Sequence, residues 1–530
     1  MRHSVESTIW RKIKLAHSLY SSTMLHTKDY KHFRLLYPNG DEIVFEGASY
    51  AHRALPGDIV DSSKVVKRAK HGPFVGVLEL ASKMRFGMTA RNHPIYRFTP
   101  YNESYPPFFV GCSQKDVSRN VLARVEFLNW DSGTCPRGNL LEILGPSGDI
   151  KAEERALLLE ACPMKWPRLE LMDPYLSSNI VTTIAQTFHI DPPGCRDVDD
   201  AISLVPVTNG VEVKIHIANV GAWLLTNPSL KKAAEFGQTY YLDGVAVKPM
   251  FPPHLSEDLF SLVRGKERQT VTLNFLWNGQ AYLDEAYWTI DMITVAESYT
   301  YDDFYDSPKA ALLGKICSSL AGRSLTDSHD WIEQLMLTYN TQAASLLKTL
   351  GTGILRRHAG KSGRYTLMES LGLPAEKLAM RAGEYCAAYE RETEHCGLGL
   401  SAYCHASSPI RRWADCINQL ALLDIIDRGE VAEQDTVPGQ VTSLNALSKL
   451  SKRFERDVLF MRALLTQKAA LEAVIVEVQD TKVKLWVPEW NRIVSAAGEG
   501  HPGDRVSMTF FADATQRSWK RRLVIRFQKI

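Results

Sequence analysis

Four aspartates stand close together near the middle of the chain. Residues 191–200 read Asp-Pro-Pro-Gly-Cys-Arg-Asp-Val-Asp-Asp, so the carboxylates belong to Asp191, Asp197, Asp199 and Asp200. Like charges a few ångströms apart repel by about 1 kcal/mol in water and by about 4 kcal/mol at an effective dielectric constant of 20. A folded protein therefore keeps such a group only where the carboxylates are solvated, protonated or bound to a cation.

The neighbours of this acidic segment argue against a solvated loop. Phe188 and Ile190 precede it and the apolar run 201–205 follows it, which is typical of a buried strand. A calcium loop of the EF-hand type does not fit, because counting from Asp197 places Ile202 where that loop requires glycine. Magnesium fits better, since it binds one or two carboxylates and takes water and substrate phosphate as further ligands. We expect Mg²⁺ here, with Mn²⁺ as the alternative.

A second polar group lies far along the chain, where residues 405–415 read His-Ala-Ser-Ser-Pro-Ile-Arg-Arg-Trp-Ala-Asp. A serine before Pro409 is typical of a helix start, so Arg411 and Arg412 are predicted in the first turns of a helix, where N–H groups favour an anion. If this segment is considered alone, structural ion pairs explain the two arginines better than a phosphate clamp does. Together with a metal held by carboxylates, they indicate phosphodiester chemistry, with arginine neutralising the transition state.

The elements that must position these groups follow from periodicity. Short apolar runs between turn residues predict strands at 42–45, 57–60, 76–78 and 124–127, followed by a helix over 151–162. Apolar residues at a spacing of 3.6 predict a helix over 329–350, and the pattern returns at 441–475. Alternation in 473–487 and 505–510 predicts a last β unit of barrel size.

The last β unit ends in a cluster of cations without an acid. The cluster consists of Arg517, Lys520, Arg521, Arg522, Arg526 and Lys529, interleaved with Trp519 and Phe527. Cations for phosphates and aromatic faces for bases are what a surface that binds single-stranded nucleic acid needs. The alternative is an exposed barrel edge that charge protects against aggregation.

Composition limits the class of protein. The 530 residues include 62 Lys and Arg against 60 Asp and Glu, and the net charge of +2 divides into +5 for 1–190, −8 for 191–430 and +5 for 431–530. The nine cysteines include no C-x-x-C pair, which disfavours a disulfide framework and a zinc site. No apolar run is long enough for a membrane span, and no signal peptide is recognisable. We expect an intracellular protein, cytoplasmic or nuclear, with a mitochondrial location as the alternative.

Five separated motifs in order resemble the ribonuclease II (RNB) family of 3′→5′ exoribonucleases. They are the stretches 188–201, His216–Val220, 249–262, 397–400 and 408–412. The residues Tyr96–Pro100, the proline pair 106–107, Arg356 and His358 look more like the eukaryotic exosome-type members. Those members often carry an endonuclease domain in front of the nuclease domain, and we expect this chain to lack it.

The resemblance implies a multidomain α+β protein with a mixed α/β catalytic domain between small β-barrels of the OB type. The implied order is a tail (1–30), two cold-shock-like OB barrels (31–95 and 96–165), the ribonuclease II catalytic domain (166–430), a helical connection (431–470) and a C-terminal RNA-binding OB barrel (471–530).

Residue roles are implied in the same way. Asp191 and Asp200 would ligate magnesium, Asp199 would be the carboxylate most important for activity, and Asp197 would complete the site, either at a second metal or at the attacking water. Arg411 would contact the scissile phosphate. The implied RNA-binding residues are Tyr241, Arg411, Arg412, Trp519 and Arg521, although His405 and Arg412 fit a structural role better than a catalytic one. The sequence departs from the family pattern at Asn219, Phe260, Ser407, Trp413 and Gln419.

These features predict a processive, Mg²⁺-dependent hydrolase that removes 5′-mononucleotides from the free 3′ end of single-stranded RNA, as a member of an RNA-processing complex or alone. One alternative is a catalytically weak or inactive RNA-binding regulator on the same scaffold. Another is an enzyme that cuts DNA, or cuts internally, because carboxylates do not distinguish the sugar. We expect no membrane partner.

Overall fold

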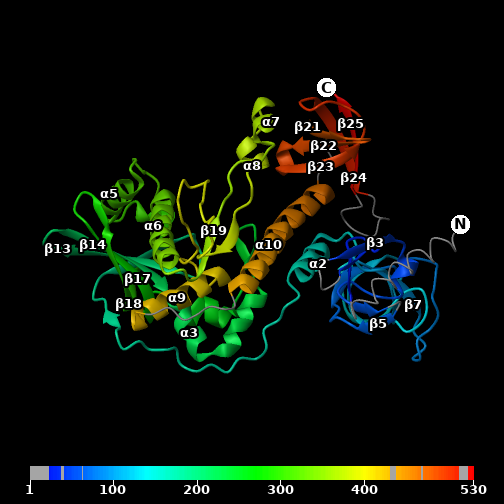
Figure 1. The fold of residues 1–530 in the computed structure, drawn as a ribbon, viewed down its shortest axis with the longest axis horizontal. Helices are drawn as coiled ribbons and strands as arrows, with labels where there is room; N and C mark the ends of the chain where they lie inside the picture. Colours follow the sequence, from blue (N-terminus) through cyan, green and yellow to red (C-terminus); the bar gives the residue numbers. More distant parts are fainter. Residues whose placement is uncertain (1–22, 37–40, 62–63, 430–436, 467–469, 513–522) are drawn as a thin grey trace. The chain divides into compact units, whose positions relative to one another are not determined.

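The polypeptide folds into two units, which the computed structural model describes over residues 23–36, 41–61, 64–429, 437–466, 470–512 and 523–530. One unit consists of residues 1–163 with 456–530, and the other of residues 164–455. Figure 1 shows the elements of both units along the chain. Within the described ranges, no helix is both long and apolar enough to cross a membrane.

The N-terminal sheet of the first unit is antiparallel and has the strand order β3-β2-β1-β4-β5. Its strands are β1 (Thr23–Thr27), β2 (His32–Leu36), β3 (Glu42–Glu46), β4 (Ile59–Asp61) and β5 (Lys64–Lys67), with the short helix η1 (Ala48–Ala51) between β3 and β4. In β2, the alternation of the sequence turns Phe33 and Leu35 inward and their neighbours to solvent. The sheet begins at Thr23, inside the segment that was predicted as a tail.

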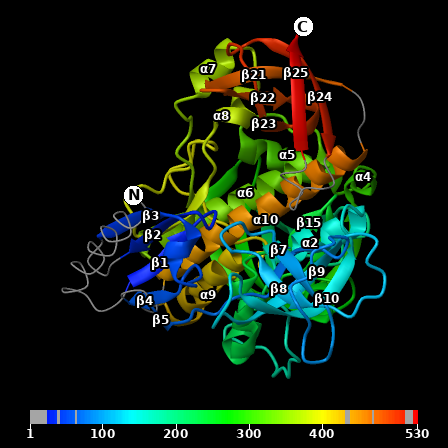
Figure 2. The same ribbon diagram turned by 90° about the vertical axis from the view of Figure 1, so that its right-hand side faces the viewer.

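A closed barrel with the strand order β10-β8-β7-β6-β9 follows (Figure 2). Its strands are β6 (Phe74–Leu78), β7 (Ile95–Pro100), β8 (Phe108–Gly111), β9 (Val121–Asn129) and β10 (Arg137–Pro146), and helix α2 (Ile150–Ala161) follows them. Gly76 on β6 lies so close to the backbone of Thr99 on β7 that a side chain would not fit. The sequence prediction placed β6 in the first barrel, which is wrong, because β6 pairs with β7 and β9.

The first unit also contains the C-terminal sheet, with the strand order β23-β22-β21-β24-β25. Its strands are β21 (Leu471–Gln479), β22 (Lys482–Val487), β23 (Arg492–Ala497), β24 (Arg505–Ala512) and β25 (Leu523–Lys529), with η4 (Pro488–Trp490) between β22 and β23. The alternating pattern that predicted these strands is confirmed at β21, β22 and β24. Trp519 and Arg521, which were predicted to bind RNA, lie outside the described residues.

The second unit is built on a sheet with the strand order β11-β18-β12-β13-β14-β17, in which β17 also pairs with β18. The strands are β11 (Val181–Thr182), β12 (Thr187–Asp191), β13 (Asp200–Val207), β14 (Gly210–Ala218), β17 (Glu267–Trp277) and β18 (Ala281–Thr300). Two two-stranded sheets accompany it, β15 (Tyr240–Leu242) with β16 (Val245–Lys248), and β19 (Ile354–Arg357) with β20 (Glu384–Ala387). The helices are α3 (Val220–Thr226), η2 (Pro228–Glu235), η3 (Leu255–Leu259), α4 (Tyr301–Phe304), α5 (Ala310–Ala321), α6 (Ser328–Thr349), α7 (Tyr365–Ser370), α8 (Ala375–Ala379), α9 (Trp413–Arg428) and α10 (Val437–Thr466), the last of which continues into the first unit.

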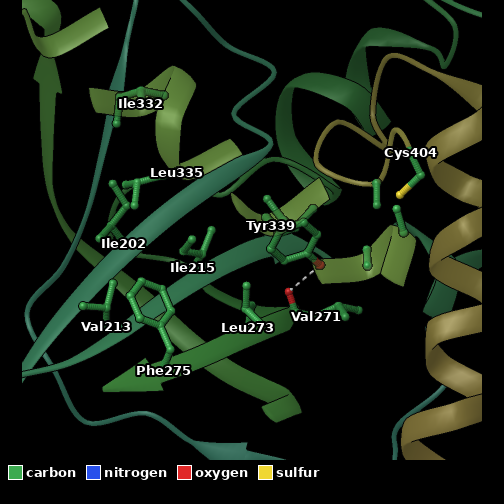
Figure 3. Close-up of a cluster of buried hydrophobic side chains, with 14 of the residues drawn as sticks. Ile202, Val213, Ile215, Val271, Leu273, Phe275, Ile332, Leu335, Tyr339 and Cys404 are labelled. Carbon is green, nitrogen blue, oxygen red and sulfur yellow. Dashed lines mark hydrogen bonds between the residues drawn. The ribbon is translucent and has the colours of Figure 1, made fainter. Parts of the chain in front are cut away.

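One apolar core joins the central strands of this sheet to α6, as the close-up in Figure 3 shows. Ile215 and Leu273 come from neighbouring strands, and Leu335 from the inner face of α6. The Tyr339 hydroxyl is buried in the same core and donates a hydrogen bond to the carbonyl oxygen of Val271, at 3.1 Å. The helix predicted over 329–350 is therefore confirmed, and its apolar stripe is the face that covers the sheet.

Candidate active site

Two neighbouring strands bring the ends of the acidic segment together. Asp191 is the last residue of β12 and Asp200 the first residue of β13, and the two strands pair antiparallel with Phe188 opposite Ile202. The connection between them turns at Gly194, whose φ of 79° suits glycine. The sequence thus places two carboxylates at one edge of the sheet and the other two in the connecting loop.

Hydrogen bonds fasten this loop to the rest of the domain. The Ser261 hydroxyl donates to the carbonyl oxygen of Arg196 at 2.7 Å and accepts from the Val198 N–H at 3.0 Å. Val198 is buried, and its carbonyl oxygen accepts from the N–H of Leu262 at 3.0 Å. The loop that carries Asp197 and Asp199 is therefore held in one position.

Asp199 meets the predicted arginine segment. Its Oδ1 accepts from the backbone N–H of Ile410 at 2.9 Å, and its Oδ2 lies 3.3 Å from Nε of Arg411. The Arg411 side chain also donates from Nη2 to the hydroxyl of Ser408 at 3.0 Å and remains 41% exposed, so part of the guanidinium is open to a ligand. The two residues are 212 positions apart in the sequence, and the fold places them in contact.

The arginines precede a helix and do not lie in its first turns, so this part of the prediction is wrong. Helix α9 begins at Trp413, and Arg412 has an extended backbone. The reason is pairing with another segment, because the Thr239 N–H donates to the carbonyl oxygen of Arg411 and the Trp413 N–H donates to that of Gly237. These bonds hold residues 411–413 beside residues 237–239, which directly precede β15.

Arg412 has a different environment from Arg411. Its Nε and Nη2 donate to the two carboxylate oxygens of Asp415, at 2.9 and 2.8 Å, and Oδ1 of Asp415 also accepts from the Ser408 N–H at 2.7 Å. This bidentate pair at the start of α9 accounts for Arg412 as a structural residue. Its predicted contact with RNA stays a prediction.

Tyr241 faces the acidic loop from the hairpin of β15 and β16. The flanking residues Tyr240 and Leu242 are buried, while the Tyr241 ring is half-buried and its hydroxyl donates to Oδ2 of Asp197 at 3.3 Å. Burial, followed by the negative charge of Asp197, raises the pKa of Tyr241. The hydroxyl is thus a neutral donor beside the carboxylates.

The surroundings of Asp197, Asp199 and Asp200 disfavour the ionised form of these carboxyl groups. Burial raises the pKa of Asp199 to about 7, against the opposing effect of Arg411, and burial also raises the pKa of Asp197. Burial, followed by repulsion from Asp191 and Asp199, raises the pKa of Asp200 well above its usual range. Carboxylates in this state gain from any cation that binds among them.

Oxygen ligands and an excess of negative charge fit a divalent cation such as Mg²⁺. Nevertheless, within the described part of the chain no three His, Cys, Asp or Glu side chains converge closely enough to form a complete metal site. The four aspartates therefore supply the right donors for a metal, and their side chains would have to turn toward it.

Sequence reasoning missed two groups beside the cluster. His189 lies with Nδ1 at 2.7 Å from Oδ2 of Asp191 and with Nε2 at 2.8 Å from the hydroxyl of Ser298. The period of two along a strand could have found it, because His189 and Asp191 must share a face. Tyr301, stacked on His329 at 3.8 Å, is near enough that its pKa is raised to about 12 by burial and by Asp200.

Two departures from the family pattern have structural partners. Asn219 caps helix α3, since its Oδ1 accepts from the Ala222 N–H at 3.0 Å. Gln419 accepts from the Gly221 N–H at 2.7 Å and donates to the carbonyl oxygen of Ala218 at 2.8 Å. Neither side chain contacts the aspartates, so these substitutions leave the acidic cluster intact.

Sequence models of known families match both the second unit and the barrel. The model of the RNB domain matches residues 182–312 and 313–428, and that of the Dis3-like cold-shock domain 2 (CSD2) matches residues 95–162. Residues 182–428 therefore form an RNB domain. The predicted family and fold class are thereby confirmed.

Similar RNB proteins include the exosome complex exonuclease RRP44 of Mus musculus, which is 22% identical over 79% of this chain and 55% of its own length. Exoribonuclease 2 of Aeromonas hydrophila is 26% identical over 59% of this chain and 58% of its own length. The chain thus spans little more than half the length of these relatives.

Solved structures share the fold of this RNB protein. Mycoplasma genitalium RNase R, in complex with ribose-methylated single-stranded RNA, aligns over 96% of this chain and 100% of its own with a TM-score of 0.73 at 14% identity. Yeast Ssd1, described as a pseudonuclease, aligns over 92% of this chain and 81% of its own with a TM-score of 0.64 at 14% identity. The same fold therefore occurs with and without nuclease function.

Proposed function

We propose that this RNB protein is a processive, hydrolytic 3′→5′ exoribonuclease that degrades single-stranded RNA to 5′-mononucleotides with Mg²⁺, or Mn²⁺, at the aspartate cluster. The observation that carries the proposal is the contact between Asp199 and Arg411, which joins the acidic loop to a partly exposed guanidinium. The family match and the nuclease relatives support it.

Each residue has a part in the proposed reaction. A divalent cation held by Asp191, Asp197, Asp199 and Asp200 would supply Lewis acidity for water and phosphate. Arg411 neutralises charge that develops on the scissile phosphate, and its contacts with Asp199 and Ser408 orient it in advance. Tyr241 offers a half-exposed ring to the last base of the strand.

A catalytically weak or inactive RNA-binding regulator is the second candidate, and the likeness to Ssd1 favours it. Against it stand Asp197, Asp199 and Asp200, which burial and repulsion between carboxylates make costly to keep without a cation.

The free 3′ end of the RNA would enter first, and an RNA-processing complex could present it. We further propose that the protein acts inside the cell, in the cytoplasm or nucleus, with mitochondria as the alternative. Its nine cysteines, all free, suit a reducing compartment.

The test uses RNA labelled at its 5′ end, with a single-stranded 3′ tail, and a DNA strand of the same sequence. The wild-type protein is incubated with Mg²⁺ or with EDTA, and the variants Asp199→Asn and Asp306→Asn are incubated with Mg²⁺. Asp306 is exposed in the same unit, so this variant controls for the loss of one charge. We expect RNA to shorten from its 3′ end with Mg²⁺ in the wild type and in Asp306→Asn. EDTA and Asp199→Asn should abolish the shortening.

Retention of intact RNA by the wild type with Mg²⁺ would establish the regulator instead. Equal degradation by Asp199→Asn, fragments from the interior of the strand, or equal cutting of DNA would overturn the proposed mechanism.

A further inference from the structure

A cavity of about 860 Å³ lies in the first unit, where loops of the N-terminal sheet meet the outside of the barrel. Its lining combines cations, carboxylates and aromatic rings, among them Arg53, Arg97, Asp29, Glu103, Tyr105 and Trp130. The volume is in the range of sites that enclose small organic ligands. None of these residues belongs to the aspartate cluster.

Strand β7 explains how a barrel supplies one wall of this cavity. Tyr96 and Phe98 point into the barrel core, so the period of two turns Arg97 and Thr99 outward. Both outward residues line the cavity, as does the proline pair 106–107. Arg97, Thr99 and the proline pair, which belong to the segment noted in the sequence at 96–107, thus line one cavity.

Arg97 lines the cavity with a side chain that is 32% exposed. Its Nε is buried and has no hydrogen-bond partner among the described residues. Oε1 of Glu79 lies 3.9 Å from this Nε, which makes an ion pair but is beyond hydrogen-bond distance. The exposed part of the guanidinium remains open to an anion in the cavity, which would accept charge-assisted hydrogen bonds from it.

The opposite wall of the cavity has a constrained backbone. Tyr30, His52 and Arg53 have φ values of 51°, 47° and 64°, a region that residues other than glycine rarely adopt. All three line the cavity. The Arg53 side chain donates to the carbonyl oxygen of Asp131 at 2.7 Å, and so ties this wall to the barrel. Such strain is often retained where a binding site needs a fixed shape.

We propose that this cavity binds a nucleoside 5′-monophosphate, with the phosphate at Arg97 and the base against Trp130 and Tyr105. Both rings line the cavity, Trp130 with 7% of its surface exposed and Tyr105 half-buried. Cations for a phosphate beside aromatic faces for a base are the pairing that recognises nucleotides. The nucleotide comes either as a free molecule or as one unit of an RNA strand. This site does not depend on the proposed hydrolysis.

The experiment measures the binding of labelled 5′-AMP to the full chain by equilibrium dialysis in EDTA, with adenosine, inorganic phosphate and hexa-adenylate RNA as competitors. Arg97→Met removes the phosphate contact, and Ser49→Trp fills the cavity from an exposed position in its lining. Arg91→Met is the control, since Arg91 is an exposed arginine near the same barrel that does not line the cavity.

We expect saturable binding of 5′-AMP that Arg97→Met weakens at least about tenfold, as the loss of a charge-assisted hydrogen bond would. Ser49→Trp should abolish the binding, and Arg91→Met should leave it unchanged. Competition by hexa-adenylate that also weakens in Arg97→Met identifies the strand as the source, and a lack of competition identifies the free nucleotide.

The proposal is overturned if 5′-AMP does not saturate the wild type, or if Arg97→Met and Ser49→Trp bind it as the wild type does. It is also overturned if adenosine or phosphate alone competes as well as 5′-AMP. Thermal unfolding of each variant shows whether it folds. If Arg97→Met does not fold, the binding of 5′-AMP to Ser49→Trp decides whether the cavity is the site.

Discussion

Ser261 holds the acidic loop at two points, through the carbonyl oxygen of Arg196 and the N–H of Val198. In Ser261→Ala both bonds are lost, and the loop that carries Asp197 and Asp199 gains freedom. We expect the rate of RNA cleavage to fall about tenfold, which corresponds to about 1.4 kcal/mol of lost orientation. Single-turnover kinetics with saturating enzyme would measure it.

Ser318 provides a matched control for this variant. Its hydroxyl donates to the carbonyl oxygen of Leu325 at 3.4 Å and accepts from the N–H of the same residue at 3.0 Å, in the same unit. Ser318→Ala should lower the thermal midpoint as Ser261→Ala does and leave the cleavage rate unchanged. An equal loss of rate in both variants would mean that Ser261 acts through stability alone.

Residue types revealed the acidic cluster because four carboxylates so close in sequence must also be close in space. They did not reveal Ser261 as a fastening residue, since a serine far along the chain carries no local sign of its partners. The position of Asp191 beside His189 was accessible in principle, because both residues point to one face of β12.

At the scale of the element, the start of α9 depends on Asp415. This carboxylate accepts from Arg412 twice and from the N–H of Ser408, and it is fully buried. In Asp415→Asn the half-buried Arg412, whose side chain is 21% exposed, loses its charged partner, and we expect the free energy of unfolding in urea to fall by about 3 kcal/mol.

Asp330 is the control, as an acidic residue in the first turn of α6. Its replacement by asparagine removes a favourable interaction with the helix dipole, worth about 0.3–1 kcal/mol. Similar losses in the two variants would show that Asp415 acts only on the dipole of α9.

Elements with a strong local pattern were predicted well, and elements fixed by distant partners were not. The apolar stripe of α6 needs no knowledge of the sheet it covers. The segment 409–412 carries a helix signal, but backbone bonds to residues 237–239 override it. Strand β6 was placed in the wrong barrel because its partner β9 lies more than forty residues away, beyond several turns.

For the whole molecule, a buried histidine links stability to pH. His216 lies 2.9 Å from both the Ser203 and Thr272 hydroxyls, and burial lowers its pKa to about 3, against the opposing effect of Asp291. Between pH 6.5 and 3 the unfolded chain binds a proton at this residue that the folded chain does not. The free energy of unfolding should therefore decrease as the pH is lowered through this range, by about 1.4 kcal/mol per pH unit from this residue.

His216→Asn should reduce that slope. Urea unfolding at pH 7, 6 and 5 gives the slope for both proteins, and equal slopes would exclude His216 as the cause. Titrating groups far from His216 contribute equally to both proteins, so the difference between the slopes belongs to His216 together with its neighbours Asp291 and Lys214.

A cation bound to the folded chain should stabilise the whole molecule. At a concentration one hundred times its dissociation constant, Mg²⁺ would add about 2.7 kcal/mol to the free energy of unfolding. We expect Mg²⁺ to raise the thermal midpoint of the wild type and of Asp306→Asn, and EDTA to reverse this. An undiminished rise in Asp200→Asn would exclude Asp200 as a ligand, whatever the activity.

The 212 residues between Asp199 and Arg411 also have a consequence during synthesis. At 5–20 residues per second, the ribosome adds the arginine roughly ten to forty seconds after the aspartate. Throughout that interval the acidic loop lacks both its guanidinium and the N–H of Ile410. We therefore expect the proposed hydrolysis to be absent from a nascent chain until Arg411 has been added, and from any product of premature termination before α9.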